Sequence, residues 1–126
     1  MENITIQKQN DFPIPMNTKV RLKTLLFKQS KSEILPESFS ELNSIFDYLQ
    51  ENINTLIMIE GHTDRIGDSD KNLILSKQRA EAIKKYLTDK GINGERITTV
   101  GYGDKIIICE PECKENRRVE FVITKK

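Results

Sequence analysis

The sequence predicts an α/β (α+β) fold, a two-layer sandwich in which helices pack on one face of a mixed β-sheet. Four segments have the alternating or β-branched pattern of strands, and two others repeat apolar residues every three or four positions, as amphipathic helices do. The chain has 126 residues, 37% of them apolar and 31% charged, which is typical of one globular domain. The predicted order is β-α-β-α-β-β.

An arm or linker is expected over residues 1–18, ahead of a single domain that spans residues 19–126. The arm carries Asn and Gln together with Pro13 and Pro15, and proline interrupts regular structure. The first strand is expected at residues 19–27, because Lys and Arg alternate there with Val and Leu before an apolar end.

The first predicted helix follows a break in the pattern at residues 32–36. Its apolar residues fall on one face at helical spacing, and they are Phe39, Leu42, Ile45, Phe46 and Leu49. The second strand, residues 56–59, is apolar on both of its alternating faces, which is typical of an interior strand covered on two sides. Gly61 closes this strand.

The second predicted helix begins after the polar loop at residues 64–70, with Asp68 or Ser69 as its candidate N-cap. Lysines near its carboxyl end suit the helix dipole, and Gly91 tolerates a left-handed exit, so the helix should end by Lys90. Its periodic apolar residues are Leu75, Ala82, Ile83, Tyr86 and Leu87.

The third and fourth strands are expected at residues 96–102 and 118–124. The former is rich in β-branched residues, and in the latter Val119, Phe121 and Ile123 recur at alternate positions. Helices between successive strands predict parallel neighbours joined by right-handed crossovers, whereas a long loop joins the last two strands.

That long loop holds the only two cysteines of the chain, Cys109 and Cys113. They can pair if the backbone turns back on itself, and a disulfide implies an oxidising compartment. Two unpaired thiols in a surface loop are the alternative that the spacing leaves open. A zinc site is disfavoured, because the single histidine, His62, is remote in sequence.

The composition argues against several classes of function. The 20 basic residues nearly match the 19 acidic ones, which leaves a net charge of +1, so no general affinity for nucleic acid is expected. No apolar run approaches the roughly 18 residues that cross a bilayer, and the amino terminus lacks the basic start and apolar stretch of a signal peptide. We expect a domain excised from a larger protein.

No motif for catalysis or for a cofactor is recognised. His62 has neither a second histidine nor a Ser or Cys nucleophile at a matching spacing, so it is interpreted as a turn-stabilising residue. If Asp64 began an EF-hand, Leu75 would stand at its twelfth position, where calcium loops need glutamate. We expect neither an enzyme nor a metal site.

Several short motifs occur in a fixed order along the chain. They are Gly61-His62-Thr63-Asp64, Asn72, Leu75-Ser76, Arg79-Ala80 and Asn116-Arg117-Arg118-Val119-Glu120. In order and spacing they resemble the C-terminal peptidoglycan-binding domain of the OmpA/MotB family, over residues 20–124. Residues 35–38 and 101–103 are also in register with that family.

The resemblance implies binding of the diaminopimelate residue in the peptide stem of peptidoglycan. The side-chain end of diaminopimelate carries an ammonium and a carboxylate, so its site needs one acid and one base. By resemblance Asp64 receives the ammonium and Arg79 the carboxylate, since a guanidinium can fork onto both carboxylate oxygens and a lysine cannot. The alternatives are that Asp64 caps its loop and that Arg79 pairs on the surface with Glu81 or Asp70.

The resemblance also assigns Asn72, Leu75 and Arg117 to the ligand site. Asn72 is expected in its polar wall and Leu75 against the ligand's methylenes, although Asn72 could instead bond the local backbone and Leu75 could belong to the core. Arg118 is expected in structural pairing, because successive residues of a strand point to opposite faces. Arg79 is not counted in the apolar face of its helix, so its substitution is expected to leave folding unaltered.

The chain departs from the family at the end of its first strand. Phe27 ends that strand and is expected at the site, but Lys28 follows it where the family commonly has Asp or Asn. The site thereby loses an acidic wall and gains a cation, unless Lys28 points into solvent. A second departure is Ile66, in a loop position where a small polar residue is often found.

The resemblance implies a non-enzymatic module that anchors a larger outer-membrane or periplasmic protein to the wall of a Gram-negative cell. Its expected partner is the peptidoglycan stem, and its expected location is the periplasm. Two alternatives stay open: the periplasmic domain of a stator-type protein, and a protein-interaction module with a decayed pocket. A peptidoglycan hydrolase is disfavoured, because no metal centre or activated nucleophile is recognised.

Overall fold

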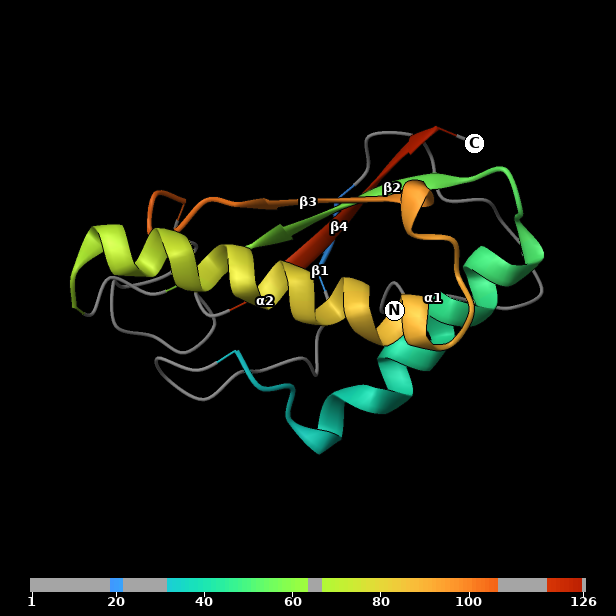
Figure 1. The fold of residues 1–126 in the computed structure, drawn as a ribbon, viewed down its shortest axis with the longest axis horizontal. Coiled ribbons are helices and arrows are strands. Elements are labelled where there is room, and N and C mark those ends of the chain that lie inside the picture. The colour runs from blue at the N-terminus through green and yellow to red at the C-terminus, as the bar shows by residue number, and fades with distance from the viewer. Residues whose placement is uncertain (1–18, 22–31, 64–66, 107–117, 126) are drawn as a thin grey trace.

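The computed structural model describes residues 19–21, 32–63, 67–106 and 118–125. They form one sheet and two helices (Figure 1). Along the chain the elements are β1 (Lys19–Arg21), η1 (Pro36–Ser38), α1 (Phe39–Glu51), β2 (Leu56–Gly61), α2 (Ser69–Asp89), η2 (Gly94–Arg96), β3 (Ile97–Gly101) and β4 (Val119–Lys125). Apart from the short 3₁₀ turns η1 and η2, the predicted order is confirmed.

The sheet has the strand order β1-β4-β2-β3. β2 and β3 pair in parallel, as predicted for strands joined by a helix, and β4 runs antiparallel to both β1 and β2. The prediction that β1 and β2 are neighbours is wrong, because β4 lies between them. β4 is strongly apolar, with buried side chains at Val119, Phe121 and Ile123. A strand of this kind is more stable inside a sheet than at its edge.

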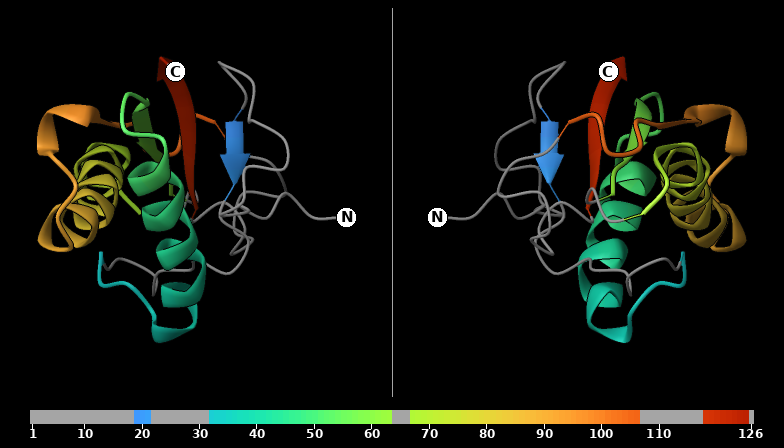
Figure 2. Two further views of the ribbon diagram at one scale, coloured as in Figure 1. Left: turned by 90° about the vertical axis from the view of Figure 1, so that its right-hand side faces the viewer. Right: turned by 90° about the vertical axis from the view of Figure 1, so that its left-hand side faces the viewer.

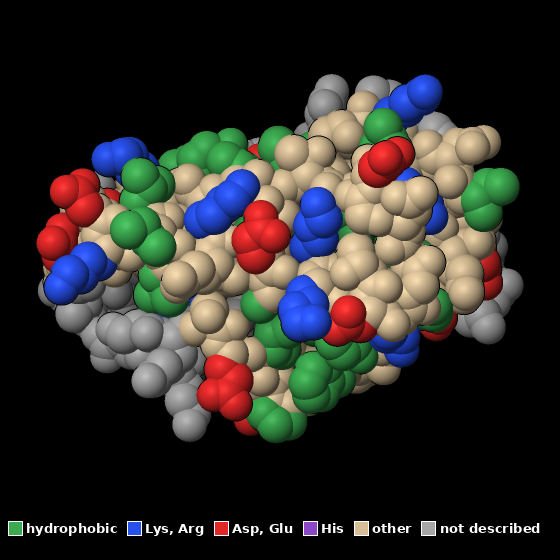
Figure 3. Space-filling view, viewed as in Figure 1, with side chains coloured by type: hydrophobic (Ala, Val, Ile, Leu, Met, Phe, Trp, Pro, Cys, Tyr) green, Lys and Arg blue, Asp and Glu red, His purple; other side chains and the backbone are tan. Residues whose placement is uncertain are grey.

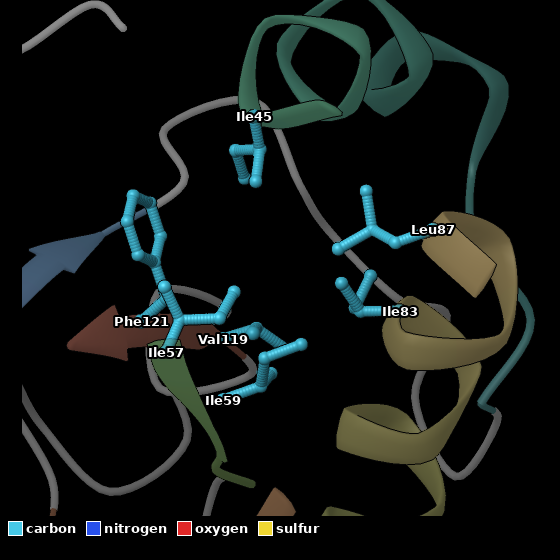
Figure 4. A pocket seen from close by; sticks show the side chains of 7 residues that line it. All are labelled: Ile45, Ile57, Ile59, Ile83, Leu87, Val119 and Phe121. Carbon is cyan, nitrogen blue, oxygen red and sulfur yellow. The ribbon is translucent and has the colours of Figure 1, made fainter. Parts of the chain in front are cut away.

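Both helices cover the same face of the sheet, as Figure 2 shows. Between the two layers, apolar side chains point toward one another, and the space that they enclose is too small for a water molecule (Figure 4). This packed interior is therefore a core rather than a ligand cavity. The side chains are Ile45 of α1, Ile83 and Leu87 of α2, Ile57 and Ile59 of β2, and Val119 and Phe121 of β4.

Arg96 joins the end of α1 to the strand layer. Its Nη2 donates to the carbonyls of Leu49 and Asn52 at 2.9 and 2.8 Å, and its Nε donates to the carbonyl of Thr55 at 3.0 Å. The last carbonyls of a helix have no partner within the helix, so this guanidinium supplies one. Burial lowers the pKa of Arg96, although a guanidinium stays protonated.

Local signals set both ends of α2 as predicted. The Asp68 side chain accepts from the backbone N–H of Asp70 at 2.8 Å, which caps the start. The helix ends at Asp89, and Gly91 then takes a left-handed φ of 114°.

Two glycines let α2 approach the sheet closely at the carboxyl ends of β2 and β3. Gly61 and Gly101 are partners across this strand pair. A Cβ on Gly101 would lie 2.5 Å from the Ser76 Oγ, and a Cβ on Gly61 would overlap the Ser76 carbonyl oxygen. The close approach holds the first half of α2 against this edge of the sheet and positions the residues that face it.

Candidate functional site

The predicted site lies where α2 crosses the carboxyl ends of β2 and β3. Asn72, Leu75 and Arg79 are three and four residues apart on α2, so they share one face of the helix. Asn72 is 8% exposed and Arg79 0%, whereas Leu75 is half-buried. The structure therefore brings these three together. The predicted residues Phe27, Lys28, Asp64 and Arg117, together with Ile66, Cys109 and Cys113, lie outside the described residues.

Arg79 is enclosed by the protein, and its Nη1 donates to the backbone carbonyl of His62 at 3.0 Å. The alternative of a surface pair with Glu81 or Asp70 is wrong, because Arg79 itself is not exposed at the surface. The expectation that Arg79 lies off the buried face of its helix is also wrong, since the glycine pair draws this part of α2 against the sheet. Taking a guanidinium out of water costs several kcal/mol unless polar contacts offset the loss.

The backbone of His62 links the three elements that border the site. Its N–H donates to the carbonyl of Arg118 at 2.9 Å, and its own carbonyl accepts from Arg79 of α2. The next residue, Thr63, donates its N–H to the carbonyl of Gly103 at 2.9 Å. The segment that leads to Asp64 is thus held by the start of β4, by α2 and by the turn after β3.

The turn after β3 is docked on the first turns of α2. Gly103 has a left-handed φ of 64°, and its N–H donates to Ser76 Oγ at 2.8 Å. A Cβ on Gly103 would come within 3.1 Å of Leu73 Cα. Both the backbone conformation and the close approach favour glycine here.

Asp104 follows in this turn and reaches the side chains at the start of α2. Its Oδ1 accepts from Ser69 Oγ at 3.1 Å, and its Oδ2 accepts from Asn72 Nδ2 at 3.4 Å. Sequence analysis did not single out Asp104. In the sequence, Asp104 directly follows residues 101–103, which are in register with the family. That position could have drawn attention to it, but its distance from Asn72 along the chain does not show that the two residues meet.

A second polar cluster lies on the sheet face opposite the helices. Glu60 and Glu120 are direct partners across β2 and β4, and both alternate with core-facing residues. The Nε of Arg118 lies 2.9 Å from Glu120 Oε2, so the prediction that Arg118 serves in structural pairing is confirmed. The His62 ring stacks on Tyr102 at 5.4 Å between centroids. His62 therefore stabilises the turn through its backbone, while its ring belongs to this cluster.

This cluster contains residues of metal-ligand types. Glu60, His62 and Glu120 each offer a ligand atom, and these atoms lie within 4.8 Å of one another. Carboxylate and imidazole groups suit zinc and similar divalent ions. However, the Arg118 guanidinium already neutralises one carboxylate, so we interpret the group as a buried ion-pair cluster that holds β4 to β2. Sequence analysis missed it because the glutamates meet only through strand pairing.

A shallow groove of ≈ 410 Å³ lies elsewhere, between residues 32–34 and the two helices. Phe39 and Tyr86 line it and stack with their ring centroids 5.3 Å apart. None of its lining residues belongs to the predicted site.

On the face of the molecule in Figure 3, basic and acidic side chains are interspersed, so neither charge forms a separate patch there.

Among the helices that the structure describes, none is both long and apolar enough to cross a membrane.

Comparison with known proteins found a match between residues 26–119 and the sequence model of the OmpA family. The peptidoglycan-associated lipoprotein of Buchnera aphidicola is 31% identical over 102 residues, which cover 81% of this chain and 59% of that protein. The peptidoglycan-binding protein ArfA of Mycobacterium tuberculosis is 34% identical over 103 residues, which cover 79% of this chain and 32% of that protein. The chain thus spans less than two thirds of the length of either relative.

A solved structure is similar to this one over most of its length. The crystal structure of the peptidoglycan-associated lipoprotein from Burkholderia pseudomallei superposes with a TM-score of 0.73 and is 26% identical in sequence. The similarity covers 79% of this chain and 87% of that one. The α+β architecture derived above is therefore shared with a solved protein.

Proposed function

Because the chain belongs to the OmpA family, whose sequence model spans its residues 26–119, we propose that it binds peptidoglycan without cleaving it. In this role it anchors a larger outer-membrane or periplasmic protein to the cell wall. The names of its sequence relatives, one peptidoglycan-associated and one peptidoglycan-binding, support this partner. The observation that carries the proposal is the face of α2 on which Arg79 lies together with Asn72 and Leu75.

The proposed ligand is the diaminopimelate residue of the peptide stem. Arg79 is proposed to receive its side-chain carboxylate, and Asp64 its ammonium. A guanidinium has five N–H donors in a planar fork, and the bond to the His62 carbonyl orients that fork. A carboxylate can accept two parallel hydrogen bonds from such a fork, which gives both affinity and geometric selectivity.

Two neighbours on α2 support the same assignment. Leu75 is half-buried one helical turn before Arg79, where its side chain can contact the ligand's methylenes. Asn72 is a polar group two turns before Arg79. Phe27, Lys28 and Arg117 are proposed to complete the site on the basis of the family resemblance.

The proposal requires that a ligand can reach the Arg79 side chain. The side chain is closed to solvent, so a ligand carboxylate can contact it only after a local rearrangement. Association is then expected to be slower than the roughly 10⁵–10⁷ M⁻¹s⁻¹ that is typical of preformed sites.

A second candidate is a protein-interaction module whose pocket no longer binds the stem. The full burial of Arg79 favours it, because a guanidinium that only orders the fold needs no access to ligand. The two candidates differ in whether a soluble stem peptide binds at all.

Calorimetric titration with a diaminopimelate-containing tripeptide tests the proposal. The comparison ligand is the same tripeptide with lysine in place of diaminopimelate, which keeps an ammonium and lacks the side-chain carboxylate. We expect the diaminopimelate peptide to bind about tenfold or more tightly than the lysine peptide, because the forked carboxylate contact is lost in the latter.

The variant Arg79→Lys should remove most of that discrimination, since lysine keeps the charge and loses the fork. Lys85→Ala is the matched control, because the Lys85 side chain is 77% exposed near the other end of α2. If the unaltered chain binds neither peptide, stem binding is excluded and the protein-interaction module is favoured.

A further inference from the structure

We infer that Lys77 closes the free edge of β3 and thereby prevents a second copy of the chain from adding its own β3 to the sheet. This inference goes beyond the proposed function and does not depend on it. Among the described strands, β3 stands at one end of the order β1-β4-β2-β3, so it has a strand neighbour on one side only. The backbone groups of such an edge can pair with another chain.

Alternation along β3 shows which backbone groups face away from β2. The Tyr102 N–H donates to the Gly61 carbonyl of β2 at 3.0 Å, so the backbone of residue 102 faces β2. Because successive peptide groups of a strand point to opposite sides, the N–H and C=O groups of Thr99 and Gly101 point outward. The N–H of Ile97 also lies on this side, but it donates to a carbonyl of η2. The open part of the edge is therefore centred on Thr99.

The sequence of β3 lacks two common protections against strand addition. Its residues, Ile97–Gly101, include neither a charged side chain nor a proline, and three of them are β-branched. β-branched residues favour strands, whereas charged residues and prolines on an edge strand oppose pairing with another chain. A protecting charge at this edge must therefore come from another element of the fold.

Lys77 of α2 supplies that charge. Its Nζ donates to the Thr99 carbonyl at 2.9 Å and to Thr99 Oγ1 at 2.9 Å. Thr99 Oγ1 in turn donates to Glu81 Oε2 at 2.6 Å, and the same carboxylate oxygen lies 3.7 Å from Lys77 Nζ. The Lys77 and Glu81 side chains are 49% and 51% exposed, so this network lies at the surface. The carbonyl that an incoming strand would use is thus already occupied by an ammonium.

A second copy of the chain is the partner that this edge fits. Two identical edges related by a two-fold axis run antiparallel, and the N–H groups of each copy then meet the C=O groups of the other. With the axis at Thr99, the Lys77 side chains of both copies would reach the centre of the interface. Neither could keep its bond to the Thr99 carbonyl while the strands pair. Lys77 therefore opposes this association in both copies at once.

The competing interpretation is that Lys77 only fastens α2 to β3. In that case, loss of the Lys77 side chain lowers the stability of the fold but leaves the chain as a single copy. Closure of the edge predicts the opposite pattern, in which a folded variant associates through β3. The two interpretations are therefore separated by the mass of the folded variant in solution.

The test uses variants of the whole chain. Lys77→Met keeps a long unbranched side chain and removes the charged donor, and Lys77→Ala does the same with the best helix former. Lys77→Arg is the rescue variant, because it keeps a charged donor at the edge. Lys85→Met is the matched control, since Lys85 forms the equivalent pair with Asp89 within α2, at 3.1 Å, and is 77% exposed. Thermal unfolding verifies that each variant is folded.

Analytical ultracentrifugation over a series of concentrations measures association. We expect the mass of Lys77→Met and Lys77→Ala to rise toward twice that of the single chain. The unaltered chain, Lys77→Arg and Lys85→Met should remain single copies. Amide hydrogen exchange measured by NMR locates the interface, and exchange of the Thr99 N–H should slow about tenfold or more as the Lys77→Met copies associate.

Three results would overturn the inference. One is that both Lys77→Met and Lys77→Ala stay single copies at every concentration, whether or not their stability falls. Another is that Lys85→Met associates to the same degree, which would indicate a general effect of losing a surface charge. The third is association without slower exchange at Thr99, or pairing of the unaltered chain through β3. None of these results bears on peptidoglycan binding, so the proposed function is tested separately.

Discussion

At the scale of single residues, backbone groups position the site as much as side chains do. The His62 carbonyl orients Arg79, and the Gly103 carbonyl holds Thr63 beside Asp64. Residue types in the sequence predict the acid and the base of the proposed site, but every residue carries a carbonyl, so the acceptor for Arg79 has no sequence signature.

Arg79→Ala should weaken binding of the diaminopimelate peptide by about 2–5 kcal/mol, because one charge of the bound ligand loses its partner. It should also lower the free energy of unfolding by about 1–3 kcal/mol, since the buried His62 carbonyl loses a donor. Calorimetry and urea unfolding measure the two effects separately. Binding equal to that of the unaltered chain would remove Arg79 from the site.

Lys28→Asp should strengthen binding of the same peptide by about 1 kcal/mol if Lys28 borders the pocket, because a repelling cation near the ammonium becomes an acid. Lys125→Asp is the control, as it makes the same change at the far end of β4. Titrations at low and high salt should show the gain shrinking as salt screens the charge. An equal gain in both variants would indicate a general charge effect and would exclude a specific wall at position 28.

At the scale of elements, the site depends on how α2 sits across the sheet. The helix carries Asn72, Leu75 and Arg79 on one face, and the pair Gly61 and Gly101 sets how closely that face approaches β2 and β3. If α2 moved slightly away from the sheet, all three side chains would move with it. Binding and stability are therefore coupled through this contact.

Gly61→Ala should lower the free energy of unfolding by about 1–3 kcal/mol or more, because the added methyl meets the Ser76 backbone rather than a side chain that can move aside. Gly94→Ala is the matched control, since a Cβ there would lie 3.7 Å from its nearest neighbours. Urea unfolding of both variants provides the comparison. Similar stability of the two variants would mean that the helix tolerates a wider separation from the sheet than the structure implies.

At the scale of the whole molecule, the described residues form a closed apolar interior and place polar groups around it. Arg79 donates to a backbone carbonyl beside α2, and Arg118 pairs with Glu120 on the sheet face opposite the helices. Among the described residues, the group of metal-ligand type on that face includes Glu120, which is already paired with Arg118. The proposed function is retention of a ligand by complementary charges, without its conversion.

The purified chain should therefore bind insoluble peptidoglycan and release no soluble wall fragments. Incubation with purified wall material, followed by chromatography of the supernatant, measures release against a heat-inactivated sample of the same protein. Co-sedimentation in the same experiment measures binding. Fragments above the heat-inactivated level would contradict the assignment of a non-enzymatic anchor.

Local patterns in the sequence determined the order of the elements and the ends of α2. Apolar periodicity predicted both helices, Asp68 or Ser69 was predicted to cap the start of α2, and Gly91 predicted its exit. These features depend on residues within a few positions of one another, so the chain encodes them locally. The short motifs between Gly61 and Glu120 are equally local, and together, in their order and spacing, they were sufficient to indicate the family.

Only the tertiary structure decided which distant groups meet. It placed β4 between β1 and β2, enclosed Arg79, and brought Asp104 to Asn72. Each of these results from pairing or packing between segments far apart in the chain, and a local pattern carries no information about its long-range partner. The sequence by itself therefore determined the elements and the chemical types at the site, whereas long-range packing decided which of those groups are buried and which face one another.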